Sequence, residues 1–326
     1  MSQSLAPLLY LSRADIEAVG LPMSQIIDAL EEMFREKGLG RVEMPPKPGI
    51  HTRPDAFMHA MPAYIPSLGA AGIKWISGYP ENHRQGLPYI TGLLILNDPE
   101  TGVPIAVMDA TWLTAQRTGA ATALAAKYLA RPDSSTAGIL ACGVQGRSNL
   151  EALATLFPLR RVKAFDLRPE IAQTFARAMG EALQLEIEVV DHPKAAVTGL
   201  DLVVTSGPIL KHPTPAIEAG WLSPGAFACP VDFDSYWQAG ALAEADRIAT
   251  DDLEQLRYYR REGYFQHTPE PYADLGQLAA GLAPGRQRAD ERLICINLGL
   301  ALEDLATAIL LYQRARAQGL GLELTR

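Results

Sequence analysis

The sequence has no long hydrophobic run and little cysteine. No stretch approaches the roughly 18 apolar residues of a membrane-spanning helix, and the apolar run near the start, about five residues long, is too short for a signal peptide. Cys142, Cys229 and Cys295 lie far apart, without CxxC spacing, and each is next to apolar residues. They are expected to be small buried side chains in a reducing compartment. We therefore expect a cytoplasmic protein, and we predict no metal site.

Positive charge is also scarce. The chain has 29 Lys and Arg against 37 Asp and Glu, which gives a net charge of −8. This balance gives no support to binding of nucleic acid or of an anionic membrane. Hydrophobic residues make up 48% and charged residues 20%, as in ordinary globular proteins. At roughly 150 residues per domain, the 326 residues allow about two domains.

The first third of the chain has a mixed pattern. Residues 8–11 are predicted to form a strand, and two helices are expected before residue 41. Prolines are then dense, and short β-like runs are separated by turn residues; these runs are 56–61, 72–76, 89–97 and 103–108. This pattern predicts a mixed, mainly antiparallel sheet.

After Ser135 the pattern changes to alternating strands and helices. The predicted strands are 136–142, 161–166, 185–191, 201–206, 225–231 and 247–250. Helices over 145–156 and 169–183 fall between the first three strands, which indicates a parallel, doubly wound sheet. Residues 255–290 are expected to be loop and short helix. A last helix is expected over 298–317 and ends before Gly319.

A glycine turn follows the first of these strands. Gly143–Gly146 leads from the strand into a helix, at the place of a G-x-G-x-x-G motif, although Ala141 replaces the first glycine. The amides of Val144 and Gln145 are expected to meet a pyrophosphate at the helix N-terminus. Alone, the motif fits an ordinary tight turn equally well, but its strand–turn–helix context favours a dinucleotide site.

The next strand adds an acidic residue at the expected distance. Asp166 lies 20 residues beyond Gly146 and ends this strand, where a carboxylate can accept both ribose hydroxyls. Its charge would repel a 2′-phosphate, so NAD(H) is favoured over NADP(H). Arg168 is the counterargument, because it can either pair with such a phosphate or simply begin a solvated helix.

Two cationic residues stand in apolar surroundings. Lys74 lies in the predicted strand 72–76, and Arg117 lies among Ala, Thr and Gly on the helix that leads to the glycine turn. Each is equally consistent with a surface charge. A buried guanidinium suits a carboxylate, to which its planar fork donates two hydrogen bonds. A lysine at the same place can bind a carboxylate, or transfer a proton if burial lowers its pKa.

Several motifs together resemble the ornithine cyclodeaminase/mu-crystallin family. They are Lys74-Trp75, Tyr79-Pro80-Glu81-Asn82, Gln85-Gly86-Leu87-Pro88, Thr101-Gly102, Ala106-Val107-Met108-Asp109, Gln116-Arg117-Thr118, Gly143-Val144-Gln145 and Gly299-Leu300-Ala301-Leu302-Glu303-Asp304. Their order and spacing are specific, and the resemblance extends from about residue 8 to 315.

The resemblance implies roles at matching positions. Lys74 and Asp232 are expected to be catalytic, with Asp234 as an alternative acid. The expected substrate-binding residues are Lys47, His59, Lys74, Arg117 and Leu298. The expected cofactor-binding residues, including those of the glycine turn, are Thr91, Thr118, Gly143, Val144, Gln145, Asp166, Arg168, Ser206 and Asn297.

Two positions depart from the cyclodeaminase pattern. Lys47 stands where those enzymes have an arginine, and His59 stands where they have a glutamate. A glutamate suits a cationic amine on the substrate, whereas a histidine does not. Similar basic choices occur in the alanine dehydrogenase branch of the family. Alternatively, Lys47 is a surface residue and His59 a structural histidine.

Three functions remain open from the sequence. The first is an oxidoreductase that passes hydride between C4 of a nicotinamide and the α-carbon of a small imino acid, such as iminosuccinate, pyruvate imine or a cyclic ketimine. The second is a cyclodeaminase-type lyase that recycles bound NAD, which Asp232 favours and His59 opposes. The third is a non-enzymatic ligand-binding protein of the crystallin type.

The resemblance also implies the architecture. The expected fold class is α/β, with a Rossmann-type doubly wound parallel sheet and a mixed α+β substrate and dimerisation domain that the C-terminal helix closes. The expected boundaries are 1–115 completed by 295–326 for the substrate domain, and 116–294 for the NAD-binding domain. Family members are usually dimers joined through the N-terminal sheets, so a homodimer that binds a small-molecule substrate is expected.

Overall fold

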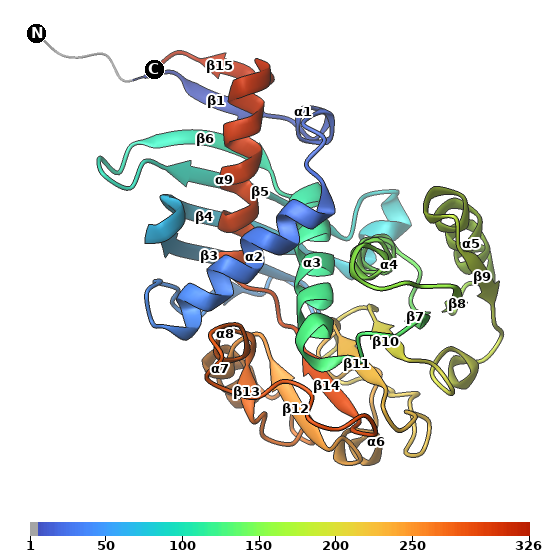
Figure 1. Cartoon of the computed structure of the whole chain (residues 1–326). Helices are drawn as coiled ribbons and strands as arrows, with labels where there is room; N and C mark the ends of the chain where they lie inside the picture. Colours follow the sequence, from blue (N-terminus) through green and yellow to red (C-terminus); the bar gives the residue numbers. More distant parts are fainter. Residues whose placement is uncertain (1–5) are drawn as a thin grey trace, which may run out of the picture. The chain divides into compact units, whose positions relative to one another are not determined.

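The computed structural model describes residues 6–326, and the chain divides into two compact units. The first unit comprises Met1–Arg117, of which the structure describes residues from Ala6 onward, together with Leu300–Arg326. The second unit is the continuous stretch Thr118–Gly299. Each unit has a β-sheet of its own (Figure 1).

The first unit contains sheet A, which has seven strands in the order β15-β1-β6-β5-β4-β3-β2. The bounds are β1 Leu8–Leu11, β2 Gly49–Ile50, β3 Phe57–Ile65, β4 Ala70–Gly78, β5 Ile90–Asn97, β6 Pro104–Asp109 and β15 Leu322–Leu324. All neighbours are antiparallel except β1 and β6, which are parallel. The predicted mixed, mainly antiparallel sheet is therefore confirmed.

Helices cover one face of sheet A. They are α1 Arg13–Ala18, α2 Met23–Gly38 and α9 Ala301–Gln318, and short 3₁₀ turns lie at Pro66–Leu68 and Pro80–Gln85. Helix α9 packs against β3, β4 and β5, and α2 packs against α9 (Figure 1). Ser12 and Asp15 form a reciprocal capping box at the start of α1, and Gly319 ends α9 with φ 66°.

Helix α3, Thr111–Leu129, begins in the first unit and continues into the second. It ends two residues before Arg131-Pro132, where a proline prevents the helix from continuing. Arg117 is the last residue of the first unit and Thr118 is the first residue of the second. The two residues that the sequence predicts for substrate and cofactor are thus consecutive on one helix.

The second unit contains sheet B, an eight-stranded parallel sheet in the order β13-β12-β14-β11-β10-β7-β8-β9. The bounds are β7 Thr136–Leu140, β8 Arg161–Phe165, β9 Glu186–Val189, β10 Leu202–Thr205, β11 Phe227–Pro230, β12 Arg247–Thr250, β13 Ala273–Asp274 and β14 Leu293–Ile296. The chain turns back at β7, since β8 and β9 lie on one side of it and β10 on the other. Ligands of doubly wound folds bind at such a switch point.

The helices of the second unit connect these strands. They are α4 Val144–Leu156, α5 Pro169–Leu183, α6 Ala239–Ala243, α7 Leu253–Arg261 and α8 Leu275–Ala279, with a 3₁₀ turn at Pro193–Ala196. Strands β10, β11 and β14 are buried along their whole length, as expected for a parallel sheet covered on both faces. The Rossmann-type fold class predicted from the sequence is therefore present.

Residues 255–290 are more ordered than the sequence indicates. They contain most of α7, the strand β13 and the helix α8. Asp252 caps α7 by accepting a hydrogen bond from Gln255 N at 2.6 Å, and Asp274 forms a capping box with Gln277. These elements are short, so hydrophobic periodicity alone does not reveal them.

The last helix begins three residues later than predicted, at Ala301 instead of Leu298. Gly299 has φ 80°, which is incompatible with a helix. Asp251, buried after β12, accepts hydrogen bonds from Leu298 N at 2.7 Å and Gly299 N at 2.6 Å. These bonds hold the segment before α9 in an extended turn. In residues 6–326, no helix is both long and apolar enough to cross a bilayer.

Candidate functional site

Lys74 is completely buried on β4 in the first unit. Its Nζ donates to Asp304 Oδ1 at 2.7 Å and to Thr114 Oγ1 at 3.2 Å. Burial lowers the pKa of Lys74 to about 7, and the neighbouring Asp304 carboxylate opposes this shift. A lysine with this pKa can bind an anion and can also release or accept a proton near neutral pH.

Arg117 lies beside Lys74 and shares its counter-ion. Its Nε donates to Asp304 Oδ1 at 2.9 Å, and its Nη1 donates to Glu303 Oε2 at 2.7 Å. The side chain of Arg117 is 7% exposed and both carboxylates are fully buried. Burial raises the pKa of Glu303. Of the two alternatives left open by the sequence, Arg117 is therefore buried rather than a surface charge, and it lies next to Lys74, the other cation that is expected to bind a carboxylate.

Two buried carboxylate oxygens complete this cluster. Glu303 Oε1 and Asp304 Oδ2 have no hydrogen-bond partner among the described residues. Buried acceptors normally have a partner, and their exceptions often mark functional sites. We call Lys74, Arg117, Glu303 and Asp304 the ion-pair cluster.

Lys47 and His59 lie near this cluster in the first unit. Lys47 is 7% exposed, so it is not an ordinary surface lysine. His59 on β3 is on the same face of sheet A as Lys74, because its register partner is Ile76. Burial first, and then the charge of Lys47, lowers the pKa of His59 to about 3. His59 is therefore neutral at physiological pH and stacks on Phe57 with ring centroids 4.4 Å apart.

Thr91 does not join these residues. It is exposed on β5 and pairs with Ser77, so it points to the face of sheet A opposite Lys74. Trp75 and Leu93 share its face and are 44% and 48% exposed. The structure thus separates Thr91 from the ion-pair cluster within the first unit.

The glycine turn of the second unit has the geometry of a phosphate-binding loop. Gly143 caps α4, and a Cβ added to it would meet nothing within 4 Å. Val144, the first helical residue, is 68% exposed, so the start of α4 is accessible. Gly146 lies so close to the preceding strand end that an added Cβ would be 2.5 Å from Ala141 O. An open N-terminus and a closely packed third glycine are what a bound pyrophosphate requires.

Ala141 takes the role of the missing first glycine with φ 71°. This left-handed conformation is unfavourable for alanine. Its carbonyl accepts a hydrogen bond from Ser206 Oγ at 2.9 Å, and its amide donates to Phe165 O at 2.9 Å. Ser206, predicted as a cofactor residue, therefore supports the turn from the end of β10.

Asp166 follows β8 and lies next to the turn. Its Oδ2 accepts from Cys142 N at 2.9 Å, and its Oδ1 accepts from Arg168 N at 3.0 Å. The backbone of Arg168 thus orients the carboxylate. Since each carboxylate oxygen has two lone pairs, these bonds leave acceptor capacity for ribose hydroxyls.

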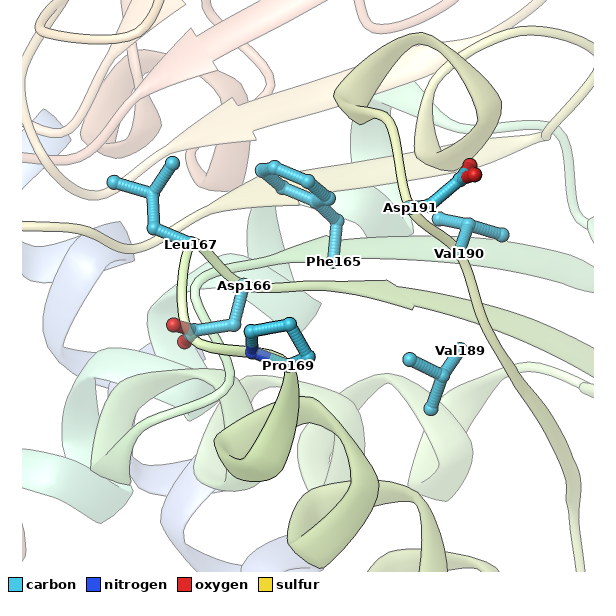
Figure 2. A pocket seen from close by; sticks show the side chains of 7 residues that line it. All are labelled: Phe165, Asp166, Leu167, Pro169, Val189, Val190 and Asp191. Carbon is cyan, nitrogen blue, oxygen red and sulfur yellow. The ribbon is translucent and has the colours of Figure 1, made fainter.

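A cavity of about 350 Å³ opens beside Asp166. Its lining is Phe165, Asp166, Leu167, Pro169, Val189, Val190 and Asp191. Figure 2 shows these side chains around the end of β8 and the segment that follows β9. The walls are mainly apolar, which would suit a flat aromatic ring beside the carboxylate of Asp166. The sequence alone does not predict this cavity, because it depends on the parallel pairing of β8 with β9.

Asp232 lies after β11 and is completely buried. It accepts hydrogen bonds from Thr205 Oγ1 at 2.8 Å and from Gly207 N at 3.0 Å, and Trp237 Nε1 donates to Thr205 Oγ1 at 3.2 Å. Burial raises the pKa of Asp232 to about 7. This pKa fits a general acid or base near neutral pH.

The other predicted residues of the second unit have distinct surroundings. Asp234, the alternative acid, accepts from Thr268 Oγ1 at 2.8 Å, and burial raises its pKa. Asn297 is 3% exposed, and its Nδ2 is a buried donor without a partner among residues 6–326. Leu298 is held by Asp251, and Thr118 is buried on α3. An unpartnered amide at Asn297 fits its expected place beside a nicotinamide.

The sequence alone indicates no role for Glu303 and Asp304, the acidic partners in the ion-pair cluster. Glu303 and Asp304 belong to a motif that supports the family resemblance, but acidic residues in the first turn of a helix are ordinary. Nothing local marks Asp251 either, which directly precedes Asp252, the N-cap residue of α7. The signal that reveals them is their complete burial, which the sequence does not show.

Comparisons with known proteins identify the family of the chain. The model of the ornithine cyclodeaminase/mu-crystallin family matches residues 9–319. An alanine dehydrogenase of Archaeoglobus fulgidus is 35% identical over 322 residues, which cover 96% of this chain and 97% of that protein.

Solved structures are similar over almost the whole chain. Delta(1)-pyrroline-2-carboxylate reductase of Thermococcus litoralis, in complex with NADH and L-proline, has a TM-score of 0.88 and 31% identity, covering 97% of this chain and 99% of that one. An archaeal alanine dehydrogenase dimer with bound NAD has a TM-score of 0.87 and 34% identity, covering 98% and 99%. This chain belongs to the ornithine cyclodeaminase/mu-crystallin family.

Proposed function

We propose that this protein is an NAD(H)-dependent oxidoreductase that reduces a small α-imino acid to the L-amino acid. The observation that carries the proposal is the pair of buried cations, Lys74 and Arg117, which bind one oxygen of Asp304 at 2.7 and 2.9 Å. Two cations that can bind the same carboxylate oxygen also suit the α-carboxylate of a substrate. The alanine dehydrogenase and pyrroline-2-carboxylate reductase relatives support this reaction class.

The proposed substrate is small and acidic. Arg117 and Lys74 bind its α-carboxylate, and Lys47 supplies a further positive charge near His59. Because His59 is neutral, it contributes a hydrogen bond rather than a charge to a second anionic group. Iminosuccinate is therefore our first candidate, followed by pyruvate imine and a cyclic ketimine.

The proposed cofactor is NAD(H) rather than NADP(H). The start of α4 receives the pyrophosphate, Asp166 accepts hydrogen bonds from the ribose, and Asn297 donates from its buried amide. When bound, the reduced nicotinamide supplies the hydride that reduces the imine. The carboxylate of Asp166 disfavours a 2′-phosphate, while Arg168 offers it only one compensating charge.

Two groups are suited to manage the proton of the reaction. The pKa values of Lys74 and Asp232 are both shifted to about 7 by burial. Perturbed groups of this kind are typical of acid–base catalysis. We propose that Lys74 or Asp232 protonates the substrate nitrogen, directly or through a water molecule.

We also propose that the protein is a homodimer. The exposed face of sheet A carries Trp75 next to Leu93, which are paired across β4 and β5. Adjacent exposed apolar side chains of this size favour a protein interface. The dimeric state of the archaeal alanine dehydrogenase supports this proposal.

A spectroscopic assay tests the reaction. The purified protein is incubated with NADH, ammonium and either oxaloacetate or pyruvate, and loss of the reduced nicotinamide is followed by absorbance, with NADPH in parallel. We expect net oxidation of NADH, faster with oxaloacetate than with pyruvate. Ammonia release from ornithine without added reductant, and no oxidation with any small oxo acid, would instead identify a cyclodeaminase.

A further inference from the structure

Asp304 occupies the central position of the ion-pair cluster. We propose that Asp304 is a positioning residue, which holds the Nζ of Lys74 and the Nε of Arg117 at the spacing that one substrate carboxylate needs. This inference rests on the proposed function, because it assigns Lys74 and Arg117 to the substrate. It adds a residue that does not itself touch the substrate.

The geometry distinguishes Asp304 from its neighbour Glu303. A single oxygen of Asp304, Oδ1, accepts from Lys74 at 2.7 Å and from Arg117 at 2.9 Å. Within the cluster, Glu303 accepts a hydrogen bond from Arg117, through Oε2 at 2.7 Å. Asp304 therefore connects β4 to α3 through side chains, whereas Glu303 anchors one of the two cations.

The ammonium of Lys74 retains a donor for a ligand. A lysine has three N–H donors, and two of them bond to Asp304 Oδ1 and Thr114 Oγ1. These two bonds fix the direction of the third N–H. The loss of either anchor would leave a buried, flexible amine without a set direction.

Charges from several elements act on Lys74. Arg117 on α3 and Lys47 before β2 destabilise its charged form, whereas Asp304 on α9 stabilises it. His59 on β3 also interacts with Lys74, but it is neutral. Among these groups, Asp304 is the one that favours the protonated form of Lys74, against burial and the two neighbouring cations.

Asp304→Asn separates the charge of this residue from its shape. The pKa of Lys74 is measured from the ¹³Cε chemical shift in protein labelled with [¹³C]lysine, and the signal is assigned with Lys74→Met. We expect the pKa to fall by about one unit or more in Asp304→Asn, because the amide no longer stabilises the ammonium. The matched control is Glu303→Gln, in which we expect the pKa of Lys74 to stay unchanged.

Asp304→Glu tests positioning without loss of charge. The longer side chain keeps a carboxylate near Lys74 but displaces it, so we expect the pKa of Lys74 to stay near its original value. The value of kcat/KM should nevertheless fall by about tenfold or more, since small misplacements of binding groups are costly. This variant also carries the test if Asp304→Asn does not fold.

The kinetic readout is the pH profile of imine reduction. In Asp304→Asn the alkaline limb should move to lower pH together with the pKa of Lys74, with a loss of roughly fivefold at pH 7 for a shift of one unit. In Glu303→Gln the alkaline limb of the pH profile should stay at the same pH, while KM for the imino acid rises.

Three results would overturn the proposal. They are an unchanged Lys74 pKa in Asp304→Asn, an equal shift in Asp304→Asn and Glu303→Gln, and an unaltered kcat/KM in Asp304→Glu. Failure of the proposed function is recognised separately. In that case the wild-type protein reduces no imino acid, although the NMR titration still reports whether Asp304 controls Lys74.

Discussion

At the scale of single residues, the site depends on charges that are removed from water. Arg117 illustrates this, because its guanidinium is 7% exposed and bonds to two carboxylates. Removing one member of a buried pair leaves an uncompensated charge, which costs several kcal/mol. Substitutions here should therefore preserve the charge if function is to be separated from folding.

Arg117→Lys is such a substitution. Lysine keeps the positive charge but lacks the planar fork that donates two parallel hydrogen bonds. We expect kcat/KM for the imino acid to fall by about tenfold or more, mainly through KM, in steady-state assays with NADH. Arg13→Ala is the control, because the Arg13 side chain is 61% exposed and should leave both constants unaltered. Unchanged kinetics in Arg117→Lys would remove Arg117 from the substrate site.

The raised pKa of Asp232 should make the stability of the protein depend on pH. Burial raises its pKa from 3.8 to about 7, so between these values the folded protein holds a proton that the unfolded chain releases. The contribution of Asp232 to the free energy of unfolding therefore decreases as the pH rises through this window. The free energy of unfolding of the wild type minus that of Asp232→Asn should decrease from pH 4 to pH 7, by at most about 1.4 kcal/mol per pH unit.

Urea unfolding at several pH values measures this difference. Asp246→Asn is the control, because hydrogen bonding to Arg292 N lowers the pKa of Asp246 and its contribution is lost only below its usual value. The free energy of unfolding of the wild type minus that of Asp246→Asn should not change between pH 4 and pH 7. A flat difference for Asp232 as well would mean that its carboxyl is not perturbed.

At the scale of elements, the turn between β7 and α4 stores a local conformational cost. Ala141 is left-handed with φ 71°, which costs an alanine about 1–2 kcal/mol. Ala141→Gly relieves this cost but increases the freedom of the unfolded chain. We expect an unfolding free energy that is equal to wild type or higher by up to about 1 kcal/mol.

Ala152→Gly provides the comparison for that prediction. Ala152 is buried within α4, where glycine lowers stability by about 1 kcal/mol. Both variants are measured by chemical denaturation with NAD absent. Equal destabilisation of the two would show that Ala141 carries no strain.

Several features of these elements can be predicted well from the sequence. Lys74 and Arg117 stand out because charged residues are rare in apolar elements, and both prove to be buried. The parallel sheet is predictable from alternating strands and helices. Gly319 ends α9 as expected, because a left-handed glycine is a local signal.

Other features depend on distant contacts and escape such reasoning. Asp304 is 230 residues from Lys74 in the chain, and nothing local marks it as a counter-ion. The sequence likewise gives no reason to separate Thr91 from Lys74, because the face of a strand follows from its register. The cavity beside Asp166 forms only when β9 is paired with β8.

At the scale of the whole molecule, the proposed dimer can be tested by measuring the mass of the protein in solution. Trp75 and Leu93 form an exposed apolar pair on sheet A. We expect wild-type protein to have twice the chain mass of 35.3 kDa in light scattering, and Trp75→Asp to shift it toward the monomer. Leu282→Asp, at a residue that is 63% exposed in the second unit, should leave the mass unchanged. A monomeric wild type would contradict the proposal.

The divided first unit also affects the order in which the molecule folds. The second unit is one continuous stretch, Thr118–Gly299, whereas the first needs both Met1–Arg117 and Leu300–Arg326. Domains fold as units during synthesis, in general from the N-terminus. In this chain, Lys74 and Arg117 leave the ribosome long before Glu303 and Asp304, the carboxylates that neutralise them. The first unit can therefore be completed only after the whole of the second unit has been synthesised.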